Sequence, residues 1–374
     1  MRHAHFEALQ PVCPACLRRG IESPLQLAPG ALEDAAGVSS GLLRCAVVDC
    51  GIAYPIIDGA PILVPDLAGW LAANGHLLLQ RHELPDPVEA VVAAALGPDA
   101  AFNVIRTQQA SYAHDHYGDL EEDGGASAAF GPPPGNYAPG NSAPGNAAPP
   151  APTPLQPGAV RRTLAAALAQ LPATTGPVLD IGCAVGRTSF DLAAACPGLV
   201  LGIDLNWPLL AIGRGILDRA VLSYPHRRLG MHFERRRHAV SFPGSDRVDF
   251  WVADALALPF RGHTFDLAMA LNVIDCVSAP PRLIAEMARV LQPGGGAAIA
   301  TPFDWNSQVT PPDAWVDGPA ALETLVAEVS AQARQAGLGA LVQTGPSHDL
   351  DWHVRLHDRA AMHYAVHLLT ASLD

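Results

Sequence analysis

The stretch Val178-Leu-Asp-Ile-Gly-Cys-Ala-Val-Gly-Arg187 decides the fold of this 374-residue chain. An apolar strand ends in Asp180 and passes into a turn that contains Gly182 and Gly186, after which a helical pattern opens near Thr188. Glycines let the backbone turn sharply and approach a ligand closely, and the start of a helix offers free N–H groups. We therefore expect a strand, a glycine turn and a helix that together bind a cofactor.

The sequence around this stretch alternates short apolar runs with helical patterns, as is typical of a parallel α/β sheet. About 20 residues on, Leu201-Gly-Ile-Asp204 ends the next strand in a carboxylate, which can accept both hydroxyls of a ribose. The expected strands are Val178–Ile181, Leu199–Ile203, Val248–Val252, Phe265–Leu271 and Ala297–Thr301. The expected helices are Arg162–Leu171, Thr188–Ala195, Pro208–Leu217, Pro281–Leu291 and Pro319–Gln335. A terminal antiparallel pair is expected at Trp352–Leu356 and Met362–Leu369.

The glycine turn allows two other interpretations. A dinucleotide-binding turn needs the frame Gly-x-Gly-x-x-Gly/Ala, which here reads Gly182, Ala184, Arg187 and fails at its last position. The second is a strand-turn-helix unit that binds no ligand.

Three further stretches indicate which nucleotide cofactor the turn would bind. Trp251–Phe260 follows the third expected strand, Thr264–Asn272 forms the fourth, and Arg289–Gly296 precedes the fifth. In this order, across residues 160–305, the chain resembles the class I S-adenosylmethionine (SAM) methyltransferases. The resemblance implies an α/β, Rossmann-like fold with a seven-stranded sheet and SAM as the cofactor.

Carried over by position, the resemblance also implies a set of cofactor contacts. Asp204 would bind the ribose hydroxyls, and Asp254 would reach the adenine amine. Ala184 departs from the pattern, since many members have glycine there, and this implies a slightly different turn. The cofactor-binding residues predicted in this way are Asp180, Gly182, Ala184, Gly186, Arg187, Asp204, Leu205, Asp254, Ala255 and Asn272.

A narrower resemblance rests on further details. Gly182–Phe190, Asn272-Val-Ile-Asp275-Cys, Thr301-Pro-Phe-Asp-Trp305 and an insert between residues 222 and 247 resemble the methyltransferase domain of the ovothiol synthases, which N-methylates an imidazole ring. The sulfoxide synthase portion of those enzymes is absent from this sequence. The resemblance therefore implies a relative that methylates a small thiol, imidazole or amine.

SAM already carries an activated methyl group, so the protein must align a nucleophile and let its proton leave. Acceptors bind beyond the carboxyl ends of strands, where Asp275, Phe303, Asp304 and Trp305 are expected. The segment 111–119 is expected either to cover the site as a lid, through Tyr112, His116 and Tyr117, or to be a solvated loop. The candidate catalytic residues are Asp275, Tyr117, His116 and Trp305.

A cysteine motif occupies the first part of the chain. Cys13-Pro-Ala-Cys16 is followed after 28 residues by Cys45 and Cys50. Two thiolate pairs on two turns supply four ligands for a structural zinc ion, Zn²⁺. Residues 8–66 resemble the small zinc-ribbon proteins that activate tRNA, rRNA and release-factor methyltransferases, although two residues rather than four usually separate the second pair. The resemblance implies a module that covers apolar surface of the catalytic domain, or one that delivers substrate.

Composition divides the chain into four parts. We expect a zinc-ribbon-like domain at 1–66, a helical connector and lid at 67–123, and a SAM-dependent methyltransferase domain at 159–374. Between the last two, residues 124–158 repeat Pro-Gly-Asn and are rich in proline and glycine, which is typical of a flexible tether.

Charge and composition limit the function. The chain has no lysine, which excludes a pyridoxal Schiff base and the lysine-dependent nucleotide sites. A net charge of −13 argues against nucleic acid as a partner. Six arginines between 227 and 247 are expected to form a solvated face, with recognition of a carboxylate, a phosphate or RNA as the alternative. The C-terminal histidines are expected at the surface or the pocket edge rather than on a metal: His348, His353, His357, His363 and His367.

The sequence shows neither a membrane-spanning apolar run nor a signal core. We expect a cytoplasmic enzyme that methylates a small molecule at nitrogen or sulfur, and leave a homodimer open. The alternatives are an RNA or protein methyltransferase guided by the cysteine module, and a non-catalytic scaffold with the SAM-binding fold.

Overall fold

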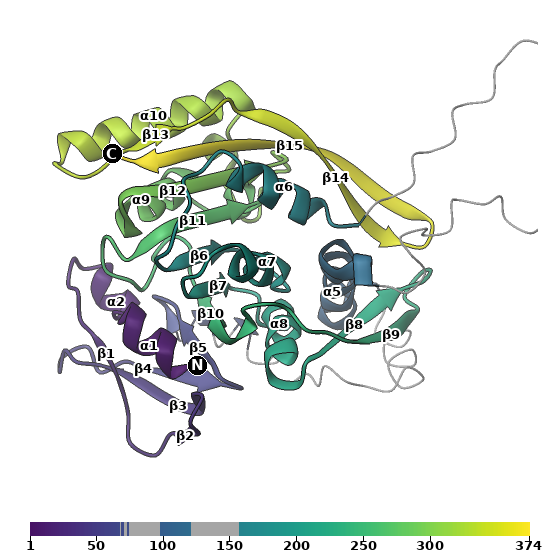
Figure 1. Ribbon diagram of the computed structural model, residues 1–374, viewed down its shortest axis with the longest axis horizontal. Coiled ribbons are helices and arrows are strands. Elements are labelled where there is room, and N and C mark those ends of the chain that lie inside the picture. Colours follow the sequence, from purple (N-terminus) through teal and green to yellow (C-terminus); the bar gives the residue numbers. More distant parts are fainter. Residues whose placement is uncertain (68, 71–72, 75–97, 121–156) are drawn as a thin grey trace, which may run out of the picture.

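The computed structural model describes residues 1–67, 69–70, 73–74, 98–120 and 157–374. Much of the helical connector expected at 67–123, including 75–97, and all but the last two residues of the expected tether lie outside the described residues. A 13-stranded sheet runs through the molecule and joins the N-terminal module to the rest of the chain (Figure 1). Among the described residues, no helix combines the length and apolarity that a membrane crossing requires.

Seven strands from residues 178–373 form one part of this sheet, in the order β10-β7-β6-β11-β12-β15-β13. The first five are parallel, and β15 runs antiparallel to both of its neighbours, β12 and β13. This confirms the predicted α/β fold. The bounds are β6 Val178–Ile181, β7 Val200–Asp204, β10 Val248–Ala253, β11 Phe265–Leu271, β12 Leu291–Thr301, β13 Leu341–Gln343 and β15 Ala360–Leu373. The strand predicted to begin at Ala297 therefore begins at Leu291, and β13 was not predicted.

Helices cover both faces of these strands, because successive strand residues are apolar and point to opposite sides. Val178 packs with the helices on one face, whereas Leu179 packs with those on the other. The first face carries α6 Ala159–Leu168, α7 Arg187–Ala195 and α8 Trp207–Arg219, and the second carries α9 Pro280–Val290 and α10 Pro319–Gln335.

The predicted helix at 162–171 is wrong by three residues at each end. Asp115, a residue distant in sequence, accepts a hydrogen bond from Ala159 N (3.1 Å) and so starts α6 early. The helix ends at Leu168, ahead of Pro172, which cannot continue it.

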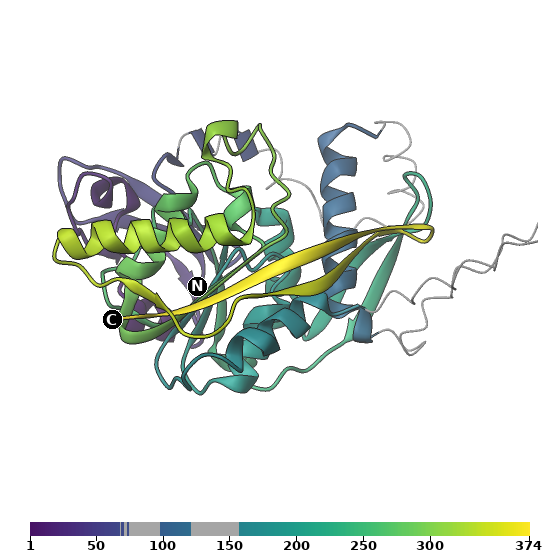
Figure 2. The ribbon, with the colours of Figure 1, turned by 90° about the horizontal axis from the view of Figure 1, so that it is seen from above.

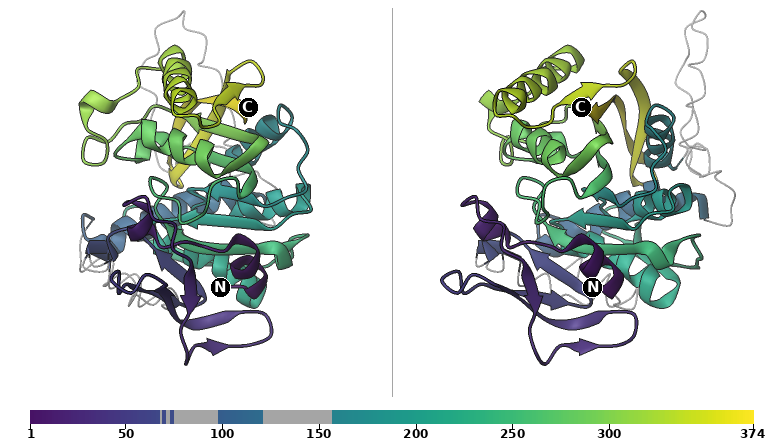
Figure 3. Two further views of the ribbon diagram at one scale, coloured as in Figure 1. Left: turned by 90° about the vertical axis from the view of Figure 1, so that its left-hand side faces the viewer. Right: turned by 60° about the vertical axis from the view of Figure 1, so that its left-hand side comes forward.

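The N-terminal module extends the sheet. Its strands follow one another to β5, and β5 pairs in parallel with β10 through Ile62 and Val252. Asp58 and Gly59 form the tight turn before β5, both with positive φ (47° and 74°), as a two-residue hairpin requires. Figure 3 shows the module beside the rest of the molecule in two views. Its elements are α1 His3–Leu9, α2 Pro14–Leu17, β1 Leu25–Leu27, β2 Leu32–Glu33, β3 Val38–Cys45, β4 Ala53–Ile57 and β5 Ala60–Leu63.

Helix α5, Ala101–Tyr117, stands at the end of the molecule toward which the parallel strands run (Figures 1 and 2). It packs between two hairpins, β8 Val221–Arg227 with β9 Phe233–Ala239, and β14 His348–His357 with β15. The predicted terminal antiparallel pair is thus confirmed and is longer than expected. Residues 111–117 are helical and mostly buried, so a solvated loop is wrong for them.

The described residues on either side of the expected tether pack together. Gly158 N donates to Asp115 O (2.7 Å), and Arg161 forms an ion pair with Asp119 (2.7 Å). The end of α5 and the start of α6 therefore lie side by side.

Candidate methyl-transfer site

The candidate site lies where the order of the parallel strands reverses. Strand β6 sits between β7 and β11, so its carboxyl end faces the crevice in which α/β sheets bind ligands. The predicted site residues follow these strands: the glycine turn follows β6, Asp204 ends β7, Asp254 follows β10 and Asn272 follows β11. The sheet therefore brings them to one edge.

The glycine turn depends on backbone conformations that only small residues tolerate. Gly182 and Gly186 have φ of 68° and 90°. A Cβ on Gly182 would lie 2.4 Å from Val273 Cγ2, and one on Gly186 would lie 2.5 Å from Phe250 Cζ. Ala184 also has positive φ, 49°, so it adopts the left-handed conformation that glycine favours.

Asp180 connects the end of β6 to the helix that follows the turn. Its buried carboxylate accepts hydrogen bonds from Thr188 Oγ1 and Ser189 Oγ, both 2.6 Å, in the first turn of α7. Burial raises the pKa of Asp180 to about 6, although these hydrogen bonds oppose the rise. The geometry gives Asp180 the role of holding the helix start in place.

The carboxylate of Asp204 is oriented for a ligand. Its Oδ2 accepts from Ala184 N (3.0 Å) and its Oδ1 from Asn206 N (2.8 Å), while the residue stays partly exposed. Burial raises its pKa. Beside it, the apolar side chain of Leu205 is 44% exposed, a surface on which an adenine ring would fit. Asp254 is held similarly, by Leu256 N (2.9 Å), and Ala255 is half-buried next to it.

The residues after β11 and β12 form the opposite side of the site. Asn272 has a φ of 58° and donates its N–H to Ala300 O (2.8 Å). Asp275 is 2% exposed and accepts from Asp304 N through Oδ2 (3.1 Å). Oδ1 of Asn272 and Oδ1 of Asp275 have no hydrogen-bond partner among the described residues. Buried carbonyl oxygens without donors are costly, and a ligand N–H would satisfy them.

Two of the predicted catalytic residues, His116 and Tyr117, lie on α5 with buried side chains. Tyr117 is fully buried and donates its hydroxyl to Val185 O in the glycine turn (2.8 Å), which makes it a positioning residue. His116 is buried too, and burial together with Arg187 lowers its pKa to about 3. Its imidazole is therefore neutral.

Arg187, a predicted cofactor contact, directs its side chain into the protein. Its guanidinium pairs with Asp119 (2.8 Å) and Asp191 (3.2 Å) and lies over the ring of Tyr117 at 5.6 Å. It fastens the end of α5 to α7. Trp305 donates its indole N–H to Val316 O (3.2 Å). That N–H is therefore already engaged within the protein.

The C-terminal histidines lie on β14 and β15, as expected for strands. His367 pairs with Asp349 (2.7 Å), and the rings of His353 and His363 stack with centroids 4.4 Å apart. Within the part of the chain that the structure describes, the one group that could hold a metal is the cysteine cluster.

The sequence did not point to Tyr364. Its hydroxyl donates to Asp304 Oδ2 (2.8 Å), because the register of β15 against β12 carries Tyr364 beyond the carboxyl end of β12. That register depends on long-range strand pairing, so no local pattern could have indicated it.

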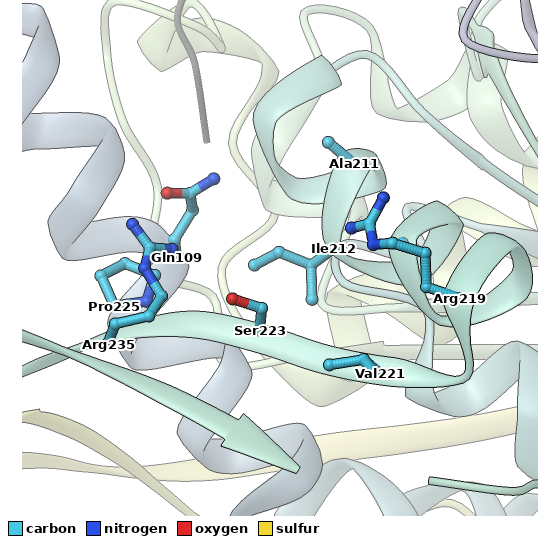
Figure 4. Close-up of a pocket in the computed structure, with 9 residues that line it drawn as sticks. Gln109, Ala211, Ile212, Arg219, Val221, Ser223, Pro225 and Arg235 are labelled. Carbon is cyan, nitrogen blue, oxygen red and sulfur yellow. The ribbon is translucent and has the colours of Figure 1, made fainter. Parts of the chain in front are cut away.

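Several arginines of the insert have protein partners, among them Arg228 and Arg247. Arg247 Nη1 donates to Gly198 O (2.8 Å), and Arg228 pairs with Asp358 (2.8 Å) and Glu234 (3.6 Å). A cavity of about 20 Å³ separates Arg219 from Arg235 between α5, α8 and β8 (Figure 4). This volume suits a single water molecule. A larger hollow of about 930 Å³ lies between α8 and the N-terminal module and contains none of the motif residues.

The four N-terminal cysteines converge, as predicted from their spacing. Their sulfur atoms all lie within 4.8 Å of one another, with Cys13 and Cys50 at 3.7 Å and Cys16 and Cys45 at 3.5 Å. Tetrahedral zinc with Zn–S bonds of about 2.3 Å separates its ligands by about 3.8 Å. The four thiols therefore fit a zinc ion.

Comparison with known proteins finds similarity to methyltransferases over about a third of the chain. Residues 179–299 match a family model described as a methyltransferase domain. Methyltransferase GfsG of Streptomyces halstedii is 33% identical over 123 residues, which cover 33% of this chain and 36% of that protein. Norajmaline N-methyltransferase of Rauvolfia serpentina is 30% identical over 122 residues, 33% of this chain and 34% of its own. The chain thus spans about a third of the length of these curated relatives.

Among solved structures, the [4+2]-cyclase SpnF is similar at 18% identity and a TM-score of 0.38, over 56% of this chain and 80% of its own. A complex between a Haloferax volcanii methyltransferase activator and a putative methyltransferase is similar at 14% identity and 0.38, over 57% and 88%. Residues 179–299 are thus similar to a methyltransferase domain, and they include most of β6 and all of β7, β10 and β11, the strands that end at the candidate site.

Proposed function

We propose that the whole chain transfers the methyl group of SAM to a nitrogen or sulfur atom of a small molecule. The observation that carries this is the carboxylate of Asp204, held by Ala184 N and Asn206 N across the glycine turn. When bound there, SAM would supply an activated methyl group. Asp204 would accept the ribose hydroxyls, and Leu205 with Ala255 would enclose the adenine.

The acceptor would lie on the side of Asn272, Asp275 and Asp304. Helix α5 lies beside this site, because its Tyr117 donates a hydrogen bond to Val185 O in the glycine turn. Tyr112 on the same helix is 44% exposed. The narrower resemblance to the ovothiol synthase domain agrees with a small acceptor that carries a nitrogen or sulfur atom.

An Asp204→Asn variant tests the cofactor site. Because charge-assisted hydrogen bonds contribute about 1.5–3 kcal/mol, the Kd for SAM should rise about 10- to 100-fold. Isothermal calorimetry measures it. Asp246→Asn is the matched control, because Asp246 lies before β10 at the opposite edge of the sheet. If wild type and Asp204→Asn bind SAM equally, the ribose is held elsewhere and the proposed site fails.

The N-terminal module would bind one structural zinc ion through Cys13, Cys16, Cys45 and Cys50. Four protein ligands leave no open position, so the metal would stabilise the fold rather than act in catalysis. Donors surround the sulfurs: Arg19 Nη2 donates to Cys16 Sγ (3.1 Å) and Ser23 Oγ lies 3.1 Å from Cys45 Sγ. Such contacts orient metal ligands and strengthen the site.

Removal of one ligand should release this metal. We expect metal analysis to find one zinc per wild-type chain and almost none in Cys16→Ser, with a lower melting temperature because metal binding contributes to folding. Cys276→Ser is the control, since that thiol is exposed and lies outside the cluster. A wild-type protein without zinc that melts at the same temperature with and without chelator would disprove a metal site.

A further inference from the structure

A group of acidic and phenolic side chains gathers on the acceptor side of the site. It combines Asp275 in the short helix η3 (Ile274–Cys276), Asp304 after β12 and Tyr364 on β15. Asp304 N donates to Asp275 Oδ2 (3.1 Å), and Tyr364 donates its hydroxyl to Asp304 Oδ2 (2.8 Å). The Asp304 backbone thus holds the Asp275 carboxylate, and the Tyr364 hydroxyl holds the Asp304 carboxylate, at the carboxyl edge of the sheet.

Asp275 retains an unused acceptor. The residue is 2% exposed, and its Oδ1 has no partner among the described residues. Oδ1 of Asn272, three residues earlier, also has no hydrogen-bond partner among the described residues. A buried carboxylate oxygen without a donor costs free energy, which a ligand that donates N–H groups would recover. Asp304 and Cys276, on either side of Asp275, are exposed to solvent.

The electrostatic field at this group is negative. The charged side chains that act on the Cys276 thiol are three aspartates, Asp275, Asp204 and Asp304. Together with desolvation by the surrounding protein, they raise the pKa of Cys276 to about 12. Desolvation and the hydrogen bond to Asp304 likewise raise the pKa of Tyr364 above its usual value.

This field distinguishes between the two acceptor atoms. A thiol or phenol reacts as its anion, and the charges of Asp204, Asp275 and Asp304 disfavour an anion beside Cys276. A protonated amine is attracted instead. In methyl transfer to nitrogen, positive charge moves from sulfur to nitrogen, and carboxylates on the nitrogen side stabilise that charge as it develops.

We propose that the methyl acceptor is an amine, bound as a cation between Asp275 and Asp304, with Asp275 Oδ1 as the base that takes its proton. This rests on the proposed function and selects nitrogen over sulfur within it. Tyr364 is the positioning residue that holds Asp304.

The reaction balances as follows. The bound ammonium gives one proton to Asp275 Oδ1, which frees its lone pair. The nitrogen then forms a bond to the methyl carbon as the carbon–sulfur bond of SAM breaks, and the sulfur keeps the electron pair. The products are a methylated ammonium and neutral S-adenosylhomocysteine (SAH), and the proton on Asp275 passes to solvent.

Binding to the SAH-loaded protein tests the proposal without turnover. Benzylamine and tryptamine are each compared by calorimetry with the alcohol and the thiol of the same carbon skeleton. We expect at least one amine to bind about tenfold or more tighter than its two counterparts, as a charge-assisted hydrogen bond implies. Asp275→Asn and Asp304→Asn should each remove this preference and leave SAH affinity unchanged, while Asp246→Asn keeps both.

The possible results separate the two proposals. If SAH binds but amines show no advantage, or thiols bind better, the amine acceptor is overturned and the methyltransferase proposal stands. If wild-type protein does not bind SAH, both fail. A preference that survives Asp275→Asn and Asp304→Asn also overturns the assignment of these residues.

The pH dependence gives a second readout. Burial and the neighbouring Asp304 raise the pKa of Asp275 to about 6, against hydrogen bonds from the backbone and Thr301. Amine binding should therefore weaken as the pH falls through about 6, where the carboxylate becomes protonated. In Asp275→Asn this step should disappear, and in Tyr364→Phe it should remain while amine affinity falls. A wild-type profile that is flat across this range contradicts the role of Asp275.

Discussion

A Gly186→Ala variant is expected to lose measurable SAH binding and about 3 kcal/mol of the free energy of unfolding. The new Cβ would lie 2.5 Å from Phe250 Cζ, in the core between β10 and α7, and the residue would have to keep a φ of 90°. Relief of either strain moves the start of α7, which carries the partners of Asp180. Urea denaturation measures the stability and calorimetry the SAH affinity.

Gly294 provides the matched control for this variant. It has a similar φ of 79°, but a Cβ there would meet nothing within 4 Å. Gly294→Ala should therefore cost only about 1 kcal/mol, the conformational part of the penalty, and should bind SAH normally. Equal losses in the free energy of unfolding of the two variants would mean that the contact with Phe250 does not contribute to the penalty in Gly186→Ala.

Asp249→Ala is expected to lower the free energy of unfolding by about 3–5 kcal/mol, because it removes the buried counter-ion of Arg214 and leaves only the exposed Asp218 at 3.8 Å. Asp249 is fully buried at the junction of the N-terminal module and the rest of the chain. It pairs with Arg214 (3.0 Å) and accepts from Arg2 N (2.7 Å) and Trp251 Nε1 (3.0 Å). The module should also be cut faster by protease in this variant.

Asp218→Ala is the control. Asp218 faces the same arginine at 3.8 Å from an exposed position, so this variant should change the free energy of unfolding by less than about 1 kcal/mol.

The stability contributed by Asp249 should also depend on pH. Burial alone would raise the pKa of Asp249, but the ammonium group of Met1 and Arg214 outweigh it and hold that pKa below its usual value. Its contribution should therefore be complete above pH about 4 and be lost as the pH falls further. If acid destabilises wild type and Asp249→Ala alike, the buried pair is not responsible.

The sequence predicted the elements whose signals are local. The five parallel strands are apolar runs bounded by turns, and the cysteine pairs carry their own spacing, so both could be found from single segments. Gly182 and Gly186 adopt the positive φ that the predicted sharp turn requires, and both lie against close neighbours.

Features that depend on distant pairing could not be predicted. No local pattern shows that β5 adds to the edge of β10, that Asp115 starts α6, or that Tyr364 reaches Asp304. Arg187 stands where a cofactor contact is expected, yet Asp119, from the other side of the expected tether, takes its guanidinium. The acceptor side of the site is built almost wholly from such long-range contacts.

A crystal structure with SAH bound tests the central claim most directly. We expect both ribose hydroxyls within about 2.6–3.0 Å of the Asp204 carboxylate, the adenine between Leu205 and Ala255, and the sulfur facing Asp275. SAH bound elsewhere, for example in the hollow between α8 and the N-terminal module, with Asp204 contacting only Ala184 and Asn206, would contradict it.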